Sequence, residues 1–323
     1  MKILWLYASM PEYDHNHWYH LDFARIINQQ KDTQLAIYGY NLEKTQWSDL
    51  VLTPFDTQIT AKDLQKIFKY DIIIMDNRYR FLRNPNKWDS INFFNNINNI
   101  PKIMIEGDFH LHKNEYLRQA WLKNNEINLI LHRHCSNFLL GNKILPQIEQ
   151  MWFPCSVDTN IFKSNPLVKR EKLICSLLYG FARKIYPERN LMANKLKLEN
   201  LVKTYECYLK NKNYIQCLQT YISHINGSSI YNINNAKMFE IMASGSILLT
   251  DENQNCGLQQ LFPENSYCTY KKDGSDIIIQ AKKIINDIDY RNYLIDNGLK
   301  CINQKHTHSI RANELINIIK DIL

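Results

Sequence analysis

Two charged residues, Lys237 and Glu240, stand three positions apart in an apolar stretch that reads KMFEIMASGSILLTD at residues 237–251. Three positions on a helix bring both side chains to nearly one face. The asparagines that precede Ala236 can cap this helix, whose first N–H groups and positive dipole end favour phosphate. A lysine beside phosphate and a glutamate that accepts hydrogen bonds from ribose hydroxyls would suit a nucleotide-sugar. A solvated surface pair is the alternative, and on spacing alone it is the commoner arrangement.

The second half of the same stretch carries three further candidates. Gly245 permits a turn and a close approach of the backbone to a ligand. The apolar strand after it ends in Thr250 and Asp251, at the position where α/β proteins bind ligands. Both side chains could contact sugar hydroxyls, and a helix N-cap role for either is about equally expected.

A group of basic residues follows Gly180, which ends another apolar run. Backbone N–H groups after such a glycine can cradle phosphate. The guanidinium of Arg183 or Arg189 could bind a diphosphate through two hydrogen bonds and stabilise it as it leaves. The alternative is that these residues and Lys184 are solvated helix charges. We expect one of the three to be functional.

In the first half of the chain, GDFHLH at residues 107–112 closes the apolar run PKIMIE. Asp108 and His110 are the candidate catalytic residues, because a histidine here could act as a base or hold an acceptor. A polar loop without a catalytic role is nearly as well supported. The sequence HRHC at residues 132–135 lacks a fourth ligand at useful spacing, so no metal site is expected there.

Apolar runs that alternate with helical stretches must position these residues. Buried strands are expected at KILWLYA, TQLAIYGY, DIIIMD, PKIMIE, INLILH, LICSLLYG and SILLTD. Such alternation predicts parallel sheets with helical crossovers. It pauses at QMWFPCSVDTNIFKSNP, which predicts a junction between a domain at 1–153 and a domain at 154–323. The expected fold class is α/β, with two Rossmann-like doubly wound domains that face each other across a ligand-binding cleft.

Four motifs resemble those of GT-B glycosyltransferases of the group 1 (GT4-like) type. KMFEIMASGSILLTD resembles their donor-binding signature, and the CgeB-like, spore-maturation branch is the closer match. Three other stretches resemble the segment after the interdomain junction, the opening of the second domain and the terminal helix: FPCSVDTNIF at 153–162, GFARKIYPER at 180–189 and HTHSIRANEL at 306–315. The resemblance is good from about Phe153 onward and weak before it.

This resemblance implies a division of labour between the domains. The first would bind the acceptor and the second the nucleotide-sugar donor, with the last helix able to pack back on the first domain. The Tyr-Pro-x-Arg pattern favours Arg189 among the basic residues, and the donor signature favours ligand roles for Lys237 and Glu240. The chain has no Asp-x-Asp run of the kind that metal-dependent GT-A enzymes use, so catalysis without a metal or other cofactor is expected.

One position departs from the pattern of the group. Many GT4-like enzymes have two glutamates separated by seven residues, and the second aligns with Glu240. The first would fall at Asn232, which is neutral. That acid usually contacts the donor sugar near its transferring carbon. Its replacement leaves the donor sugar and the stereochemical course of the reaction open.

The expected reaction transfers a sugar from a UDP- or GDP-linked donor to the hydroxyl of a glycan, lipid-linked or protein acceptor, in glycan or cell-surface polysaccharide synthesis. Two alternatives stay open. Asn232 motivates a non-catalytic module that binds a nucleotide or a sugar. The net charge of +7 motivates a glycosyltransferase that acts on modified DNA bases. Because the chain lacks a concentrated basic stripe, a nucleic-acid partner ranks below a glycan acceptor.

Composition bounds these expectations. The hydrophobic share of 45% and the charged share of 22% are ordinary for a packed globular protein. No apolar run reaches the length that spans a bilayer. The eight cysteines form no CxxC pair, which favours reduced core residues in a cytosolic protein. We therefore expect a cytoplasmic location, and the positive charge also permits peripheral contact with the inner membrane face.

Overall fold

A computed structural model describes most of the chain and divides it into two compact units. The described residues are 1–7, 21, 23–40, 42, 47–56, 58–76, 93–94, 97, 99–107, 122–178 and 182–323. The first unit comprises Met1–Arg133, Asn137–Pro154 and Arg311–Leu323. The second comprises His134–Ser136 and Cys155–Ile310.

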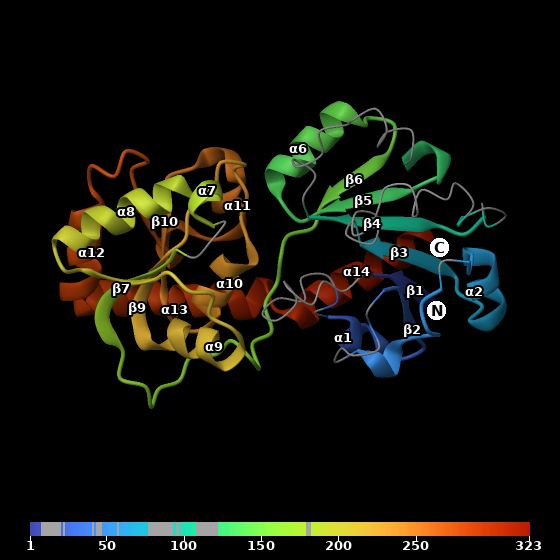
Figure 1. Ribbon diagram of the computed structural model, residues 1–323, viewed down its shortest axis with the longest axis horizontal. Coiled ribbons are helices and arrows are strands. Elements are labelled where there is room, and N and C mark those ends of the chain that lie inside the picture. Colours follow the sequence, from blue (N-terminus) through green and yellow to red (C-terminus); the bar gives the residue numbers. More distant parts are fainter. Residues whose placement is uncertain are drawn as a thin grey trace. The chain divides into compact units, whose positions relative to one another are not determined.

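The first unit is built on a six-stranded parallel sheet whose order is β2-β1-β3-β4-β5-β6 (Figure 1). The strands are β1 (Lys2–Leu6), β2 (Gln34–Tyr38), β3 (Ile72–Asp76), β4 (Lys102–Glu106), β5 (Leu129–His132) and β6 (Glu149–Trp152). Its described helical segments are α1 (Ala24–Asn28), η1 (Ser48–Leu50), α2 (Ala61–Ile67) and most of α6 (Cys135–Ile144).

Both faces of this sheet are covered, which explains why β1, β3, β4 and β5 read as nearly continuous apolar runs. In β1, Ile3 and Trp5 join the core cluster on one face, whereas Leu4 and Leu6 join the cluster on the other. Successive side chains of a strand point to opposite faces, so a strand covered on both sides needs apolar residues throughout.

The last helix, α14 (His308–Ile322), contributes to the core of the first unit. Ala312, Leu315, Ile316 and Ile319 are buried in the same cluster as Ile3 and Trp5 of β1. Their spacing of three, one and three residues places them along one face of a helix. The apolar stripe of α14 therefore packs in one cluster with residues of β1, which lie about 300 positions earlier in the chain.

The second unit is built on a five-stranded parallel sheet of order β11-β10-β9-β7-β8. The strands are β7 (Glu171–Leu177), β8 (Val202–Tyr205), β9 (Tyr221–Ile225), β10 (Ile247–Asp251) and β11 (Cys268–Tyr270). The helices are α7 (Ala182–Ile185), α8 (Pro187–Leu198), α9 (Asn211–Thr220), α10 (Ala236–Ala243), α11 (Leu258–Leu261), α12 (Ile277–Asn286) and α13 (Ile288–Lys305), with short 3-10 turns η3 (Gln254–Cys256) and η4 (Glu264–Ser266).

When the strands of each unit are numbered from 1 in chain order, the first sheet has the order 2-1-3-4-5-6 and the second, read from β8 to β11, has the order 2-1-3-4-5. In such a doubly wound sheet, the order reverses between the first and third strands, and ligands bind beyond the carboxyl ends of the strands at that point. In the second unit the reversal lies between β7 and β9. The expected α/β fold with two parallel-sheet, Rossmann-like domains is confirmed. No helix in the described ranges is both long and apolar enough to cross a membrane.

Candidate functional site

Arg189 lies at the point where the strand order of the second unit reverses. It projects from the first turn of α8, which begins at Pro187, and only 2% of it is exposed. Its Nη2 donates to Oδ1 of Asn226 at 2.6 Å, and its Nη1 approaches the carbonyl of Leu177 at 3.5 Å. Leu177 ends β7 and Asn226 directly follows β9. The guanidinium therefore spans the carboxyl ends of the two strands.

A ring of polar contacts fixes the orientation of this guanidinium. Arg189 stacks on the ring of Tyr186, with 4.1 Å between the guanidinium carbon and the ring centroid. The hydroxyl of Tyr186 accepts a hydrogen bond from Nδ2 of Asn235 at 2.9 Å, and Oδ1 of Asn235 accepts one from Asn226 at 2.9 Å. Among the described residues, Nε of Arg189 is buried without a hydrogen-bond partner. A buried cationic group with an unused donor is suited to an anionic ligand.

Lys237 adds a second cation to this site from the first turn of α10. Asn235 occupies the N-cap position, yet its side chain bonds Tyr186 and Asn226 instead of the helix N–H groups. Lys237 is partly buried, and its Nζ lies 5.9 Å from the ring centroid of Tyr214. Burial lowers the pKa of Lys237 to about 8, and repulsion by Arg189 acts in the same direction. An anion at this helix N-terminus would stabilise both cations.

Glu240 lies one turn further along α10 and is buried, with 4% exposed. Its Oε2 accepts a hydrogen bond of 2.5 Å from the hydroxyl of Tyr214 in α9. Attraction to this carboxylate partly opposes the lowering of the Lys237 pKa. Lys237 and Glu240 are therefore electrostatically coupled inside the protein, and a solvent-exposed surface pair does not describe them.

Asp251 ends β10 and anchors the loop that follows β9. Its carboxylate accepts hydrogen bonds from the backbone N–H of Ser228 at 2.8 Å and from the Ser228 hydroxyl at 2.6 Å. Asp251 and Thr250 are each 1% exposed, and the Thr250 hydroxyl donates to Asp251 at 3.3 Å. The helix-cap alternative for these two residues is wrong, because Asn253 is the N-cap of the next helical turn, η3.

The loop between β9 and α10 holds Asn232 in an uncommon backbone conformation. Its φ is 54°, and Ser229 in the same loop has a φ of 66°. Oδ1 of Asn232 accepts a hydrogen bond from Nδ2 of Asn253 at 2.7 Å. The position where the GT4-like pattern has an acid therefore carries a neutral amide that is tied to the loop after β10.

Gly245 lies at the opposite end of α10 from Lys237, so the structure does not bring these two residues together. Its φ of +70° is a conformation that glycine adopts without strain. A Cβ added there would lie 2.6 Å from the Ser164 hydroxyl oxygen. The glycine is required by the turn that follows the helix.

Four of the predicted site residues lie wholly or in part outside the described residues. Asp108, His110 and Gly180 lie outside the described residues, and so does the side chain of Arg183. Within the described ranges, the structure gathers Arg189, Lys237 and Glu240 around the amino end of α10, and it places Thr250 and Asp251 on the adjacent strand end.

Sequence reasoning missed three residues that orient this site. Asn226 immediately follows an apolar strand, which is a usable signal because ligands bind at strand ends. Tyr186 stands next to the Pro187 that begins α8, within the quoted Tyr-Pro-x-Arg motif. Tyr214 gave no such signal, since only the packing of α9 brings its hydroxyl to Glu240.

Known proteins resemble this chain in its second unit and in its fold. Residues 170–317, which cover the strands of the second unit, match a family described as glycosyl transferase-like. No curated protein matches the chain significantly.

Solved structures match over the whole chain at low sequence identity. Sucrose-phosphate synthase from Thermosynechococcus elongatus has a TM-score of 0.65 and 10% identity, over 99% of this chain and 98% of that one. Anabaena Alr3699/HepE, solved with UDP and glucose, has a TM-score of 0.66 and 13% identity, over 99% and 100%. An alpha-glucosyltransferase solved with UDP and a 13-mer DNA has a TM-score of 0.66 and 11% identity, over 99% of each chain. The fold of this chain is that of GT-B glycosyltransferases.

Proposed function

We propose that this chain is a glycosyltransferase that moves a sugar from a nucleotide diphosphate-sugar to an acceptor hydroxyl. The observation that carries the proposal is the pair of cations, Arg189 and Lys237, at the amino end of α10 and the reversal point of the sheet. A departing nucleoside diphosphate develops negative charge, and fixed cations in a partly dry site stabilise that charge strongly. The glycosyl transferase-like match over residues 170–317 supports the same assignment.

The remaining residues of the site have proposed roles that follow from their positions. Glu240, one turn from Lys237, would accept hydrogen bonds from the ribose hydroxyls, and Tyr214 would hold its carboxylate in place. The loop that Asp251 anchors through Ser228 would line the sugar side of the donor. The Gly180 loop and Arg183 would add contacts to the diphosphate. We propose UDP as the nucleotide, since several similar folds are solved with UDP.

The acceptor would bind the first unit, through the loops that follow its strands. We retain Asp108 and His110, which follow β4 in the sequence, as the proposed catalytic pair, with His110 taking the proton from the acceptor hydroxyl. A glycan, a lipid-linked sugar or a protein is the proposed acceptor, and the CgeB-like branch and a cytoplasmic location belong to the same proposal. Because Arg189 and Lys237 can neutralise the diphosphate, transfer should proceed without added Mg²⁺ or Mn²⁺.

Calorimetry with UDP, GDP and ADP tests the donor site. We expect one of the three to bind, and we expect Lys237→Met and Glu240→Gln to weaken that binding by about tenfold or more, as for the loss of a charged hydrogen bond. Lys212→Met is the matched control, since Lys212 is exposed on α9. Absence of binding at millimolar nucleotide, or full affinity in Glu240→Ala, would refute the proposal.

A second candidate function is a non-catalytic module that binds a nucleotide or a sugar. The observation that favours it is Asn232, a neutral residue bonded to Asn253 where many GT4-like enzymes carry an acid. Release of UDP from UDP-sugars, followed over time, distinguishes the two functions. Turnover that Lys237→Met abolishes would exclude the module, whereas tight binding without any release would favour it.

A further inference from the structure

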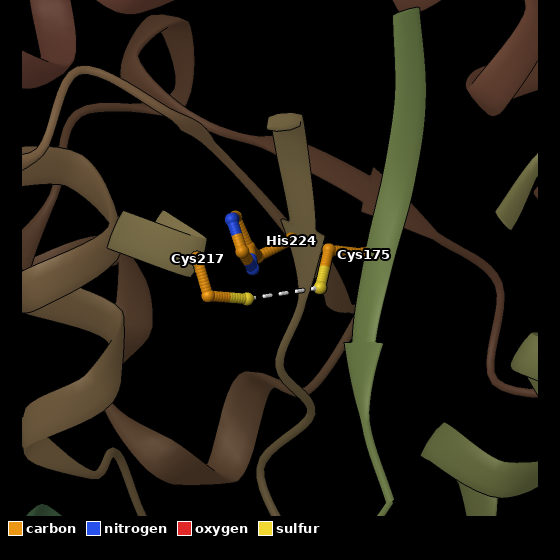
Figure 2. Close-up of side chains that lie close together, drawn as sticks. All are labelled: Cys175, Cys217 and His224. Carbon is orange, nitrogen blue, oxygen red and sulfur yellow. Dashed lines mark hydrogen bonds between the residues drawn. The ribbon is translucent and has the colours of Figure 1, made fainter. Parts of the chain in front are cut away.

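Three residues that can bind metals meet inside the second unit: Cys175, Cys217 and His224 (Figure 2). Cys175 is in β7 and His224 is in β9, and the two are register partners in these adjacent parallel strands. Cys217 comes from α9, which packs over that face of the sheet. All three residues are buried, with 4% exposed or less.

Their spacing suits a single ion. The two sulfur atoms are 3.6 Å apart, and one ligand atom from each of the three residues lies within 4.8 Å of the others. Two thiolates on a tetrahedral zinc ion, each about 2.3 Å from the metal, lie about 3.8 Å apart. The sulfur atoms are thus near this separation, and no disulfide joins them.

The imidazole of His224 is the third member of the cluster. One ring nitrogen lies beside the sulfur atoms and the other points away from them (Figure 2). Among the described residues, Nε2 is buried without a hydrogen-bond partner. The ring also makes hydrogen bonds to the backbone of Leu218 and Cys217, so its other nitrogen, Nδ1, has a partner within the protein, and a metal that binds through Nδ1 would replace that partner.

We propose that Cys175, Cys217 and His224 form a binding site for a thiophilic divalent cation, of which zinc is the best-suited example. Two thiolates and one imidazole make a ligand set that zinc favours, and a water molecule would complete a tetrahedron. The two thiolates together would balance the double positive charge of the ion. This balance is needed because two cationic side chains, Lys237 and Arg170, already lie close to the cluster. The ion would have a structural role, since it would join β7, α9 and β9.

Cobalt(II) titration of the reduced protein tests this site. Thiolate ligation gives Co²⁺ a charge-transfer band in the near ultraviolet, and tetrahedral geometry gives it strong visible bands. The measurement uses a Cys207→Ser background, because Cys207 is exposed and could bind cobalt by itself. We expect one equivalent to produce both bands and one equivalent of Zn²⁺ to remove them.

Single substitutions assign the ligands. Cys217→Ser and His224→Gln should lose or shift the bands, whereas Cys301→Ser, at another buried cysteine of the same unit, should keep them. Near-ultraviolet circular dichroism and UDP calorimetry show whether each variant is folded. Absence of one-equivalent binding in the reduced parent, or unchanged spectra in a folded Cys217→Ser variant, would overturn the proposal and leave a pair of core thiols. Because nucleotide binding is measured separately, failure here does not bear on the transferase assignment.

Discussion

The guanidinium of Arg189 combines three contacts that a lysine cannot reproduce. It stacks on Tyr186, donates to Asn226 and approaches the carbonyl of Leu177. Arg189→Lys should therefore weaken UDP binding by about 10- to 100-fold, the range for lost hydrogen bonds to charged groups. Arg291→Lys is the control. The guanidinium of Arg291 likewise makes hydrogen bonds within the protein, to the carbonyls of Ile284 and Ile285, but Arg291 lies on α13. Equal affinity of Arg189→Lys and the parent in calorimetry would contradict a diphosphate role.

Lys237 should make nucleotide binding depend on pH. Burial and Arg189 lower its pKa to about 8, so the free protein loses this charge as the pH rises through that value. UDP is fully ionised above about pH 7, because its terminal phosphate has a pKa near 6. We therefore expect UDP affinity to fall between pH 7 and pH 9.5. Lys237→Arg should bind with little pH dependence over this range, and an equally flat profile in the parent would contradict the argument.

The same residue affects stability in a defined window. The pKa of Lys237 in the folded state is below its usual value of 10.5, so the unfolded chain binds more protons between about pH 8 and pH 10.5. The free energy of unfolding therefore rises with pH in that window. Below pH 8, the charged form of Lys237 destabilises the folded protein by the full cost of burying it. Lys237→Met should remove this cost. Urea unfolding at pH 7 should show a more stable variant, and a Lys237→Met protein less stable than the parent at this pH would contradict the argument.

Helix α10 carries the candidate ligand-binding residue Lys237 in its first turn, whereas its carboxyl end is followed by the turn at Gly245. A substitution at Gly245 should therefore change stability without changing nucleotide binding. A non-glycine residue in the left-handed region costs about 1–2 kcal/mol, and a Cβ here would also press against Ser164. Gly245→Ala should lower the free energy of unfolding by at least this amount. The double variant with Ser164→Gly should recover the steric part alone. UDP affinity of the folded Gly245→Ala protein should stay unchanged, because Lys237 is at the other end of the helix.

Elements differ in how well the sequence predicts them. Strands β1, β3, β4 and β10 are buried on both faces and were expected from their apolar runs. Strand β8 was missed, since this edge strand is only partly buried and reads VKTY without an apolar run. Lys237, Glu240 and Arg189 were found from motifs, whereas the contacts of Asn226, Asn235 and Tyr214 depend on tertiary packing that local sequence does not encode.

At the scale of the molecule, α14 stabilises the first unit although it follows the second in the chain. Leu315 is fully buried in the core cluster of the first unit, so Leu315→Ala should cost about 2–5 kcal/mol of stability. Asn317→Ala, at an exposed position of the same helix, is the control. Chemical unfolding measures the loss, and UDP affinity under folding conditions should be equal in both variants. A Leu315→Ala protein as stable as the control would contradict this packing.

The position of α14 in the chain also determines when the core of the first unit can be completed during synthesis. A ribosome makes residues 1–154 first, but the apolar stripe at Ala312, Leu315, Ile316 and Ile319 emerges only after the entire second unit. Until then, the nascent amino-terminal half exposes the apolar surface that α14 later covers. A chaperone that binds such surfaces would therefore find its substrate in the first unit while the second unit is still being translated.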